Sequence, residues 1–386
     1  NYVDALDPRK AWTSTSTRND ARWRVRDNLP GSRDFCPTVV WNDRTREAAE
    51  LDLRARWSDL AGTLGDDLLA RAAVWMTTKE SRASFAIEGE ERETGKIARF
   101  AAMTETESGR SDAPLDPDRI RSLQRHALGE DALAYGFRRS PVFVGHTFRY
   151  ADVVDYIAPD YVIVPSLIGG LAETERRTRG GASLVRAAVL SFGFVYVHPL
   201  ADGNGRLSRF LVNDVFRLDG AIAAPYVVPI SAVVLGARGE YDRALEAFSA
   251  PFMKRFGGTY RLGPNRRYDD GLTSTLEFDA YAEAEPAYRY PDLTVQTEYL
   301  ADVVRRTLDT ELPDEARTIR RFRDSREAVK EIVEAPDSVA DRIVRSLVEN
   351  RYVLSGKLVA EYPSLAGERG DRIAAAVRAI VEDAPE

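Results

Sequence analysis

Apolar residues recur at three- to four-residue spacing between Thr45 and Trp75, and this periodicity predicts one or two amphipathic helices. Residues 79–88 continue the helical pattern, and Gly89 then provides a stop. Before Thr45 the chain is rich in Arg, Asp, Asn and Pro and has little apolar periodicity. We therefore expect an extended or loosely packed arm followed by helices.

The middle of the chain mixes helical and extended signals. A helix is predicted over residues 116–135, because Pro117 stands near its start and Gly136 follows its end. The apolar run 141–145 is bounded by Pro and Gly, which predicts a short extended segment. Residues 156–165 are rich in β-forming residues but contain prolines, which confine them to an edge strand or an irregular hairpin.

The strongest apolar stretch, residues 182–197, predicts a buried helix that ends at His198. Helical periodicity resumes over residues 204–218, so a tight loop joins two helices. Glycines and prolines between residues 256 and 271 predict a linker, and apolar spacing from about Val295 predicts further helices. The predicted class is mainly α, with an N-terminal region (1–115), a core (116–255) and a linker with a C-terminal helical domain (256–386).

Composition narrows the class of protein. The 386 residues are 44% hydrophobic and 30% charged, which is typical of a globular protein of two or three domains. A net charge of -7 argues against a nucleic-acid-coating surface. The lone Cys36 cannot form an internal disulfide, and the charged N-terminus and the proline-broken run 220–237 predict neither a signal peptide nor a membrane span. We expect a cytoplasmic protein with no membrane partner.

One run of twelve residues, from His198 to Arg209, concentrates the groups that a phosphate site needs. It reads His-Pro-Leu-Ala-Asp-Gly-Asn-Gly-Arg-Leu-Ser-Arg. Three backbone amides at a helix start form an anion cradle, and two arginines can bind phosphate oxygens. The amides belong to Gly203, Asn204 and Gly205, and the arginines are Arg206 and Arg209.

The remaining two groups of this run suggest attack on a phosphate. Asp202 would repel a phosphate unless a cation lay between them, which implies Mg²⁺. His198 can accept a proton at neutral pH. A glycine-rich turn, an arginine pair or a lone histidine is usually structural when it occurs alone, but the combination favours a site. With three histidines and no His-Glu-x-x-His, no zinc site of the usual ligand set is expected.

The run resembles the Fic family pattern His-Pro-Phe-x-(Asp/Glu)-Gly-Asn-Gly-Arg-x-x-Arg, and only Leu200 departs from it. Flanking stretches are similar to Fic features too, and the resemblance covers about residues 44–255. These stretches are Pro141–Gly145, Tyr156–Asp160, Pro229–Ser231 and Glu240–Tyr241.

The resemblance implies a Fic-fold helical core with a β-hairpin flap that transfers AMP from ATP to a protein hydroxyl. His198 would deprotonate a Ser, Thr or Tyr, and Asp202 would hold Mg²⁺ against the α- and β-phosphates. The amides of the cradle and Asn204 would steady the α-phosphate, and the two arginines would bind the outer phosphates. Residues 155–165 would form the flap, which aligns the target by strand addition, and Tyr241 would border the adenosine. Fic proteins commonly add a C-terminal helical or winged-helix module.

A second motif, Ser84-Phe-Ala-Ile-Glu88-Gly89, resembles the inhibitory motif (Ser/Thr)-x-x-x-Glu-(Gly/Asn) of the second Fic class. The resemblance implies that Glu88 pairs with Arg209 and withdraws it from the γ-phosphate. So short a motif also arises by chance, but its position ahead of the core favours the inhibitory role.

Three other features of the sequence are not assigned to the site. His126 and His146 are interpreted as structural or surface residues, and the basic run 317–326 as the solvated face of a helix. The expected partners are ATP and a target protein, or the protein itself by self-modification; a homodimer stays open and nucleic acid is not expected. The alternatives are removal of AMP, transfer of another phosphate-linked group, or a regulatory ATP sensor whose C-terminal helices bind DNA or protein.

Overall fold

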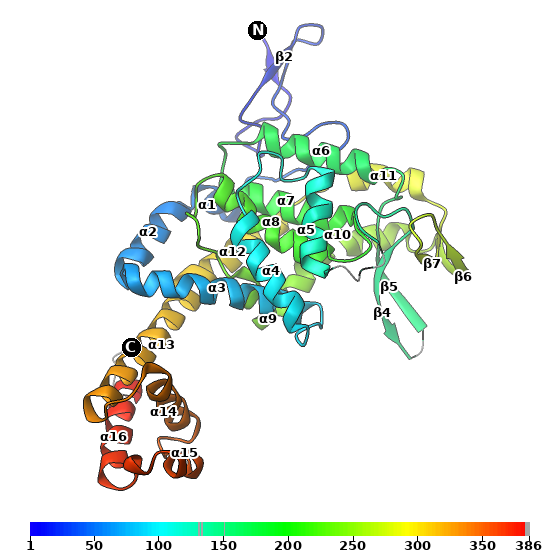
Figure 1. Ribbon diagram of the computed structural model, residues 1–386. Coiled ribbons are helices and arrows are strands. Elements are labelled where there is room, and N and C mark those ends of the chain that lie inside the picture. Colours follow the sequence, from blue (N-terminus) through cyan, green and yellow to red (C-terminus); the bar gives the residue numbers. More distant parts are fainter. Residues whose placement is uncertain (130–131, 133, 150, 383–386) are drawn as a thin grey trace. The chain divides into compact units, whose positions relative to one another are not determined.

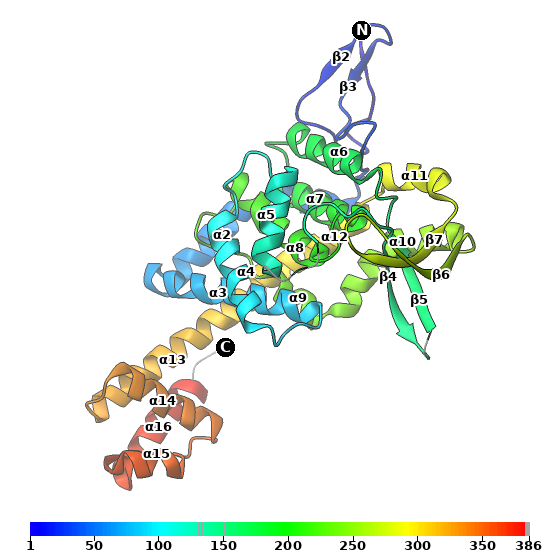
Figure 2. The same cartoon turned by 45° about the vertical axis from the view of Figure 1, so that its right-hand side comes forward.

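The computed structural model describes residues 1–129, 132, 134–149 and 151–382 (Figures 1 and 2). The chain forms two compact units. The first contains Asn1–Asp59 and Ala73–Leu308, and the second contains Leu60–Ala72 and the chain from Asp309 onward. Most described residues are helical, which confirms the prediction of a mainly α fold.

The first unit is built around two helices, α7 (Ser183–Val197) and α8 (Asn204–Leu218). Nearly every side chain of α7 is buried, as expected for a helix without a polar face. Helices α1 (Asp43–Glu50), α6 (Val164–Arg177) and α12 (Thr294–Arg306) pack against α7. Figures 1 and 2 show the pair α7 and α8 enclosed by the other helices of this unit. The loop between them is therefore held on a rigid support.

Four helices precede the core in the sequence. They are α2 (Leu53–Leu64), α3 (Asp66–Ile87), α4 (Thr94–Glu107) and α5 (Pro117–Leu128), of which α4 and α5 contact α8 directly. Helix α5 starts where Asp116 accepts hydrogen bonds from the N–H groups of Asp118 (3.0 Å) and Arg119 (3.1 Å). It ends at Gly129, whose φ of 84° no longer fits a helix. The predicted helix 116–135 was therefore too long, because Gly129 and not Gly136 stops it.

A two-stranded antiparallel hairpin, β4 (Phe143–Phe148) and β5 (Ala151–Ile157), projects beside the core. The flap predicted at 155–165 was misplaced, since β5 ends at Ile157 and α6 begins at Val164. Pro159 and Pro165 lack the N–H that would continue the ladder. The extended run predicted at 141–145 overlaps the first residues of the other strand, β4.

A second hairpin replaces the linker predicted between residues 256 and 271. Strands β6 (Tyr260–Arg267) and β7 (Thr273–Phe278) pair antiparallel, with a register break between Leu262 and Arg266. The break falls where Gly263 and Pro264 interrupt regular pairing. These residues suggested a linker but form an irregular strand.

The remaining elements of this unit are α9, α10 and α11 and a small N-terminal sheet of order β1-β3-β2. The sheet accounts for only part of the predicted arm, and the arm is not loosely packed throughout. Phe35 and Val39 are fully buried, and the N–H groups of Cys36 and Thr38 bond to carbonyls near residue 290. The bounds are Ile230–Gly236, Arg238–Phe256 and Tyr281–Arg289 for the helices, and Val3–Asp4, Arg18–Asp20 and Val25–Asp27 for the strands.

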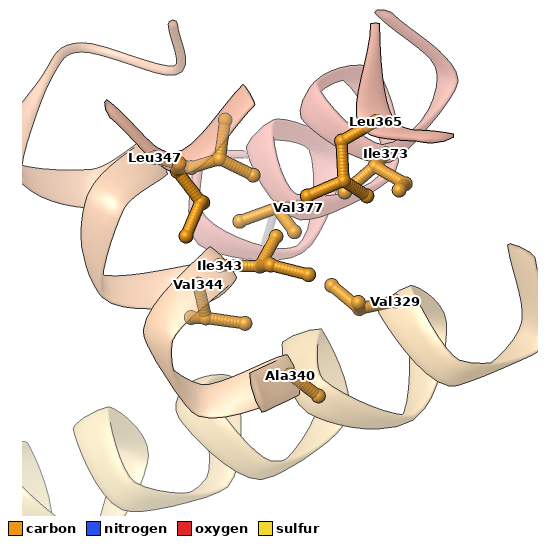
Figure 3. Packing of buried hydrophobic residues seen from close by; sticks show 9 residues of the cluster. Val329, Ala340, Ile343, Val344, Leu347, Leu365, Ile373 and Val377 are labelled. Atoms are coloured by element: carbon orange, nitrogen blue, oxygen red, sulfur yellow. The ribbon is translucent and has the colours of Figure 1, made fainter. Parts of the chain in front are cut away.

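From Thr307 onward, the elements that the structure describes are all helical. Of the two expected C-terminal modules, helical or winged-helix, these residues match the helical one. Apolar side chains of α13, α14, α15, α16 and the short turn η2 form a separate core (Figure 3). Ile343, Val344 and Leu347 of α14 meet Val329 of α13 and Val377 of α16 there. The helices are η1 (Thr307–Glu311), α13 (Leu312–Ile332), α14 (Asp337–Glu349), α15 (Gly356–Glu361), η2 (Pro363–Leu365) and α16 (Glu368–Glu382).

Candidate active site

A cleft of about 550 Å³ lies within the first unit. Its walls come from the end of α3, the hairpin β4–β5, the end of α7 with the following loop, and α10. His198, Gly205, Glu88 and Tyr241 all line it. Residues from the twelve-residue run, the upstream motif and α10 therefore share one cavity, although they are up to about 150 positions apart in sequence.

His198 caps the C-terminal end of α7 in a left-handed conformation, with φ of 50°. Its N–H donates to Phe194 O (3.0 Å), and its ring Nδ1 lies 3.2 Å from Val195 O. Because a carbonyl oxygen only accepts, Nδ1 carries the ring proton and the lone pair is on Nε2. Burial of the ring, followed by the positive charge of Arg138, lowers the pKa of His198 to about 4. The imidazole is therefore neutral at pH 7 and able to accept a proton.

Arg138 holds the backbone on which His198 stands. Its Nε donates to His198 O (2.7 Å), Nη1 to Ser140 O (2.9 Å) and Nη2 to Pro159 O (2.6 Å). Ser140 and Pro159 flank the hairpin β4–β5, so one buried guanidinium joins both roots of the hairpin to the end of α7. Sequence reasoning missed Arg138, because no motif signals a contact with a residue 60 positions away.

The loop after His198 is fixed by its own amide side chain. Asn204 Oδ1 accepts from Leu200 N–H and Asn204 Nδ2 donates to Leu200 O, both at 2.9 Å. Gly203 adopts φ of 92°, which favours glycine. The side chain of Asn204, expected at the α-phosphate, is therefore bonded to the backbone of Leu200 within the loop.

Of the three N–H groups expected to form an anion cradle, that of Gly203 donates to Asp202 Oδ1 (2.6 Å), while those of Asn204 and Gly205 lie at the N-terminus of α8. The first N–H group that reaches a helical carbonyl is that of Leu207, bonded to Gly203 O at 2.9 Å. The preceding amides, including those of Asn204 and Gly205, are at the positive end of the helix dipole. A Cβ added to Gly205 would collide with Glu88 Oε1. A carboxylate of the protein itself therefore lies against this end of the cradle.

Arg209 is bound by the upstream motif. Its Nε donates to Ser84 Oγ (2.9 Å), and its Nη2 donates to Ser84 O (2.9 Å) and to Glu88 Oε1 (2.8 Å). Its Nη1 is buried without a hydrogen-bond partner among the residues that the structure describes. Ser84, in the last turn of α3, and Glu88, directly after the helix, thus meet Arg209 as the resemblance implied.

Arg206 is bound by a residue that sequence reasoning did not single out. One of its Nη atoms contacts Glu90, and Nη2 donates to Asp202 Oδ1 at 2.7 Å. The guanidinium carbon lies 5.0 Å from the centre of the Phe85 ring, a cation–π contact. Gly89 lies between Glu88 and Glu90 with φ of 77°, so its role in the motif is conformational.

A buried carboxylate anchors α3 one turn before Ser84. Glu80 accepts hydrogen bonds from the N–H (2.7 Å) and the hydroxyl of Ser231, at the start of α9. Burial raises the pKa of Glu80 to about 7. Sequence reasoning missed Glu80 too, because only the fold brings α3 and α9 together.

Of the remaining predicted residues, Tyr241 and His146 line the cleft. Tyr241, on the cleft wall, packs against Phe192 and Tyr299 at ring distances of 6.3 and 6.0 Å. His146 was expected to be structural or a surface residue; it is exposed, lines the cleft and bonds through Nδ1 to Asp155 Oδ2 (2.8 Å). His126 is exposed, and its Nδ1 lies 2.8 Å from Ser122 O.

The described residues contain no group of three or more His, Cys, Asp or Glu side chains placed to hold a metal ion. Asp202 stands at the cradle with its side chain 61% exposed. Mg²⁺ is commonly held by one or two carboxylates together with phosphate oxygens and water. The residues present therefore fit Mg²⁺ that arrives with a nucleotide, and Asp202 would be its protein ligand.

The fold and the site define a helical domain in which a neutral histidine and a helix N-terminus with two arginines adjoin the same cleft. Residues 114–215 match the Fic/DOC family, and the match includes the whole run from His198 to Arg209. The chain therefore contains a Fic domain.

Two proteins are similar to part of this chain. The protein adenylyltransferases fic-1 of Caenorhabditis briggsae and Caenorhabditis elegans are each 29% identical over 143 residues, which is 36% of this chain. The chain spans about a quarter of the length of these two proteins.

A solved structure, that of a Fic family protein from Desulfovibrio desulfuricans G20, aligns over 86% of both chains with a TM-score of 0.47 and 17% identity. Among the described residues, no helix is both long and apolar enough to cross a membrane.

Proposed function

We propose that this protein is an adenylyltransferase that moves AMP from ATP to a Ser, Thr or Tyr hydroxyl of a target protein. The observation that carries the proposal is the neutral His198 in the same cleft as the α8 N-terminus. The names of the two Caenorhabditis relatives support the choice of AMP as the transferred group. The single cysteine supports a cytoplasmic placement, which belongs to the same proposal.

In this mechanism His198 acts as the general base. Its Nε2 takes the proton from the target hydroxyl while the hydroxyl oxygen forms a bond to the α-phosphorus. The bond from that phosphorus to the bridging oxygen breaks, and pyrophosphate leaves with the electron pair. The Nδ1 hydrogen bond to Val195 O keeps the ring in the tautomer that this step needs.

The N-terminus of α8 binds the negatively charged phosphates of ATP in this mechanism. The backbone N–H groups of Asn204 and Gly205 would donate to α-phosphate oxygens, and the helix dipole favours an anion there. Arg206 and Arg209 would bind the outer phosphates once their present partners release them. Mg²⁺ held by Asp202 would supply charge neutralisation between the phosphates.

The protein restrains this activity through Glu88. The carboxylate of Glu88 lies against Gly205 and accepts a hydrogen bond from Arg209, so it competes with a phosphate for both. An ATP molecule whose γ-phosphate cannot reach Arg209 would bind in an unproductive position. Release of Glu88 therefore restores transfer.

The test uses the full chain, ATP labelled at the α-phosphate, magnesium and cell lysate. Glu88→Gly should raise labelled AMP incorporation on the order of tenfold or more, since it removes a charge-assisted hydrogen bond. Glu91→Gly is the matched control, because Glu91 is an exposed residue of the same segment. Mass spectrometry then locates the adduct, and an unchanged rate in Glu88→Gly would refute the restraint.

One observation favours a second reaction at the same site. Glu88 lines the same cleft as His198, and its side chain is 36% exposed, so it could orient a water molecule for the removal of AMP. Loading the protein with an AMP-modified target in the absence of ATP separates the two. Release of AMP by the parent chain, lost in Glu88→Gly, would favour removal over transfer.

A further inference from the structure

The two arginines of the site are held by different residues of one short segment. Arg209 is bound by Ser84 and Glu88. Arg206 is bound by Glu90, and its guanidinium stacks on Phe85. The segment 84–90 therefore restrains both phosphate-binding side chains at once.

The turn after α3 explains how one segment reaches both. The N–H of Gly89 donates to Ala86 O (3.0 Å) and the N–H of Glu90 donates to Phe85 O (2.9 Å). This wraps the chain around the end of the helix, and Gly89 supplies the left-handed residue that such a turn needs. Glu88 precedes Gly89 in this turn, and Glu90 follows it. The two carboxylates thus reach different arginines.

Both Nη atoms of Arg206 have carboxylate partners. Its two Nη atoms face Glu90 and Asp202, and its Nε is buried without a partner among the described residues. The side chain of Arg206 is 2% exposed, whereas that of Glu90 is 31% exposed. Asp202 lies four residues before Arg206, in the loop that leads into α8, but Glu90 belongs to a separate segment. Freeing Arg206 for a phosphate therefore requires that Glu90 withdraw.

We propose that Glu90 is a second inhibitory carboxylate, which occupies Arg206 as Glu88 occupies Arg209. The inference rests on the proposed function for its biological meaning, because it assigns outer phosphates to Arg206. It differs from the Glu88 restraint in its target, since Glu88 lies against the cradle at Gly205 and Glu90 contacts the neighbouring arginine. The consequence is that Glu88→Gly alone leaves the protein only partly released.

Nucleotide binding tests this without any chemistry. Isothermal titration with α,β-methylene-ATP and magnesium compares the parent chain, Glu88→Gly, Glu90→Gln and the double variant. Glutamine keeps the size of the side chain and removes its charge, so Glu90→Gln should tighten binding on the order of tenfold. The double variant should bind more tightly than Glu88→Gly by a similar factor.

Two controls separate this effect from a general change in structure. Glu91→Gln removes the same charge from an exposed neighbour and should leave the affinity unchanged. AMP, which lacks the outer phosphates, should bind the parent chain and Glu90→Gln equally well. Equal tightening of AMP and of the ATP analogue would overturn the assignment of Glu90 to Arg206.

The results also separate this inference from the proposed function. Unchanged or weaker binding of the analogue by Glu90→Gln, with no gain over Glu88→Gly in the double variant, would overturn the role of Glu90. Tighter binding together with no AMP transfer by the double variant would leave the role of Glu90 standing and refute the transferase.

Discussion

The base side and the phosphate side of the cleft are held in different ways. On the base side, backbone carbonyls and Arg138 hold His198 in place, and its Nε2 lone pair is ready for a proton. On the phosphate side, carboxylates from residues 88–90 and from Asp202 contact both arginines. Under the proposed function, the difference teaches that restraint would act on nucleotide binding while the base stays ready to accept a proton. A switch of this kind needs only the movement of one short segment.

The largest expected effect breaks the base side alone. His198→Ala in the Glu88→Gly background should lower AMP transfer about 100- to 10,000-fold, because general base catalysis is typically worth this much. Affinity for α,β-methylene-ATP should change little, since in the proposed mechanism the phosphates bind at α8 and not at His198. Labelled incorporation and isothermal titration measure the two quantities. A variant that kept its full biological effect would instead support the regulatory-sensor alternative.

The second prediction probes the crowding of Gly205 by Glu88. Gly205→Ala should destabilise the parent chain by about 1–3 kcal/mol, because the added Cβ collides with Glu88 Oε1. In the Glu88→Gly background the same substitution should cost clearly less. Urea unfolding of the four variants gives the coupling free energy, and equal costs in both backgrounds would contradict the contact.

The third prediction concerns Glu80, the residue that anchors α3 to the start of α9. The folded protein holds the Glu80 proton up to about pH 7, whereas the ordinary value is 4.5. Between these pH values the folded state binds more protons than the unfolded chain, so this group contributes stability that is lost as pH rises. Glu80→Gln should remove this pH dependence. Between pH 4.5 and 7, the free energy of unfolding of the variant should therefore rise relative to that of the parent chain by on the order of 2 kcal/mol. Unfolding of both proteins across this range checks it, and parallel curves would show that Glu80 titrates normally.

The smallest effect is a shift of the His198 pKa. Because its folded pKa of about 4 is below the ordinary 6.5, the unfolded chain binds more protons between these values. The contribution of His198 to stability therefore rises with pH across this window. Arg138→Met should raise the pKa of His198, since the charge of Arg138 helps to lower it. Ring NMR titration measures this, with Arg139→Met as the control at an exposed neighbour.

Much of the site was predictable because it is contiguous. The helix, loop and helix from residue 182 to 218 follow from apolar spacing and glycines, and the structure places α7 and α8 as predicted. The pairing of Glu88 with Arg209 was predicted from a resemblance and not from spacing, and the two side chains meet. The hairpin β6–β7 was missed because Gly263 and Pro264 look like linker residues when no partner strand is in view.

The sequence by itself determined the chemistry available in residues 198–209, since the residue types and the short loop are local properties. The tertiary structure decided how those groups are held. Arg138, Glu80 and Glu90 reach the site from 60 or more positions away, and no local pattern records such contacts. Side-chain hydrogen bonds depend on atoms a few ångströms apart, and only the packed core brings these segments within that distance.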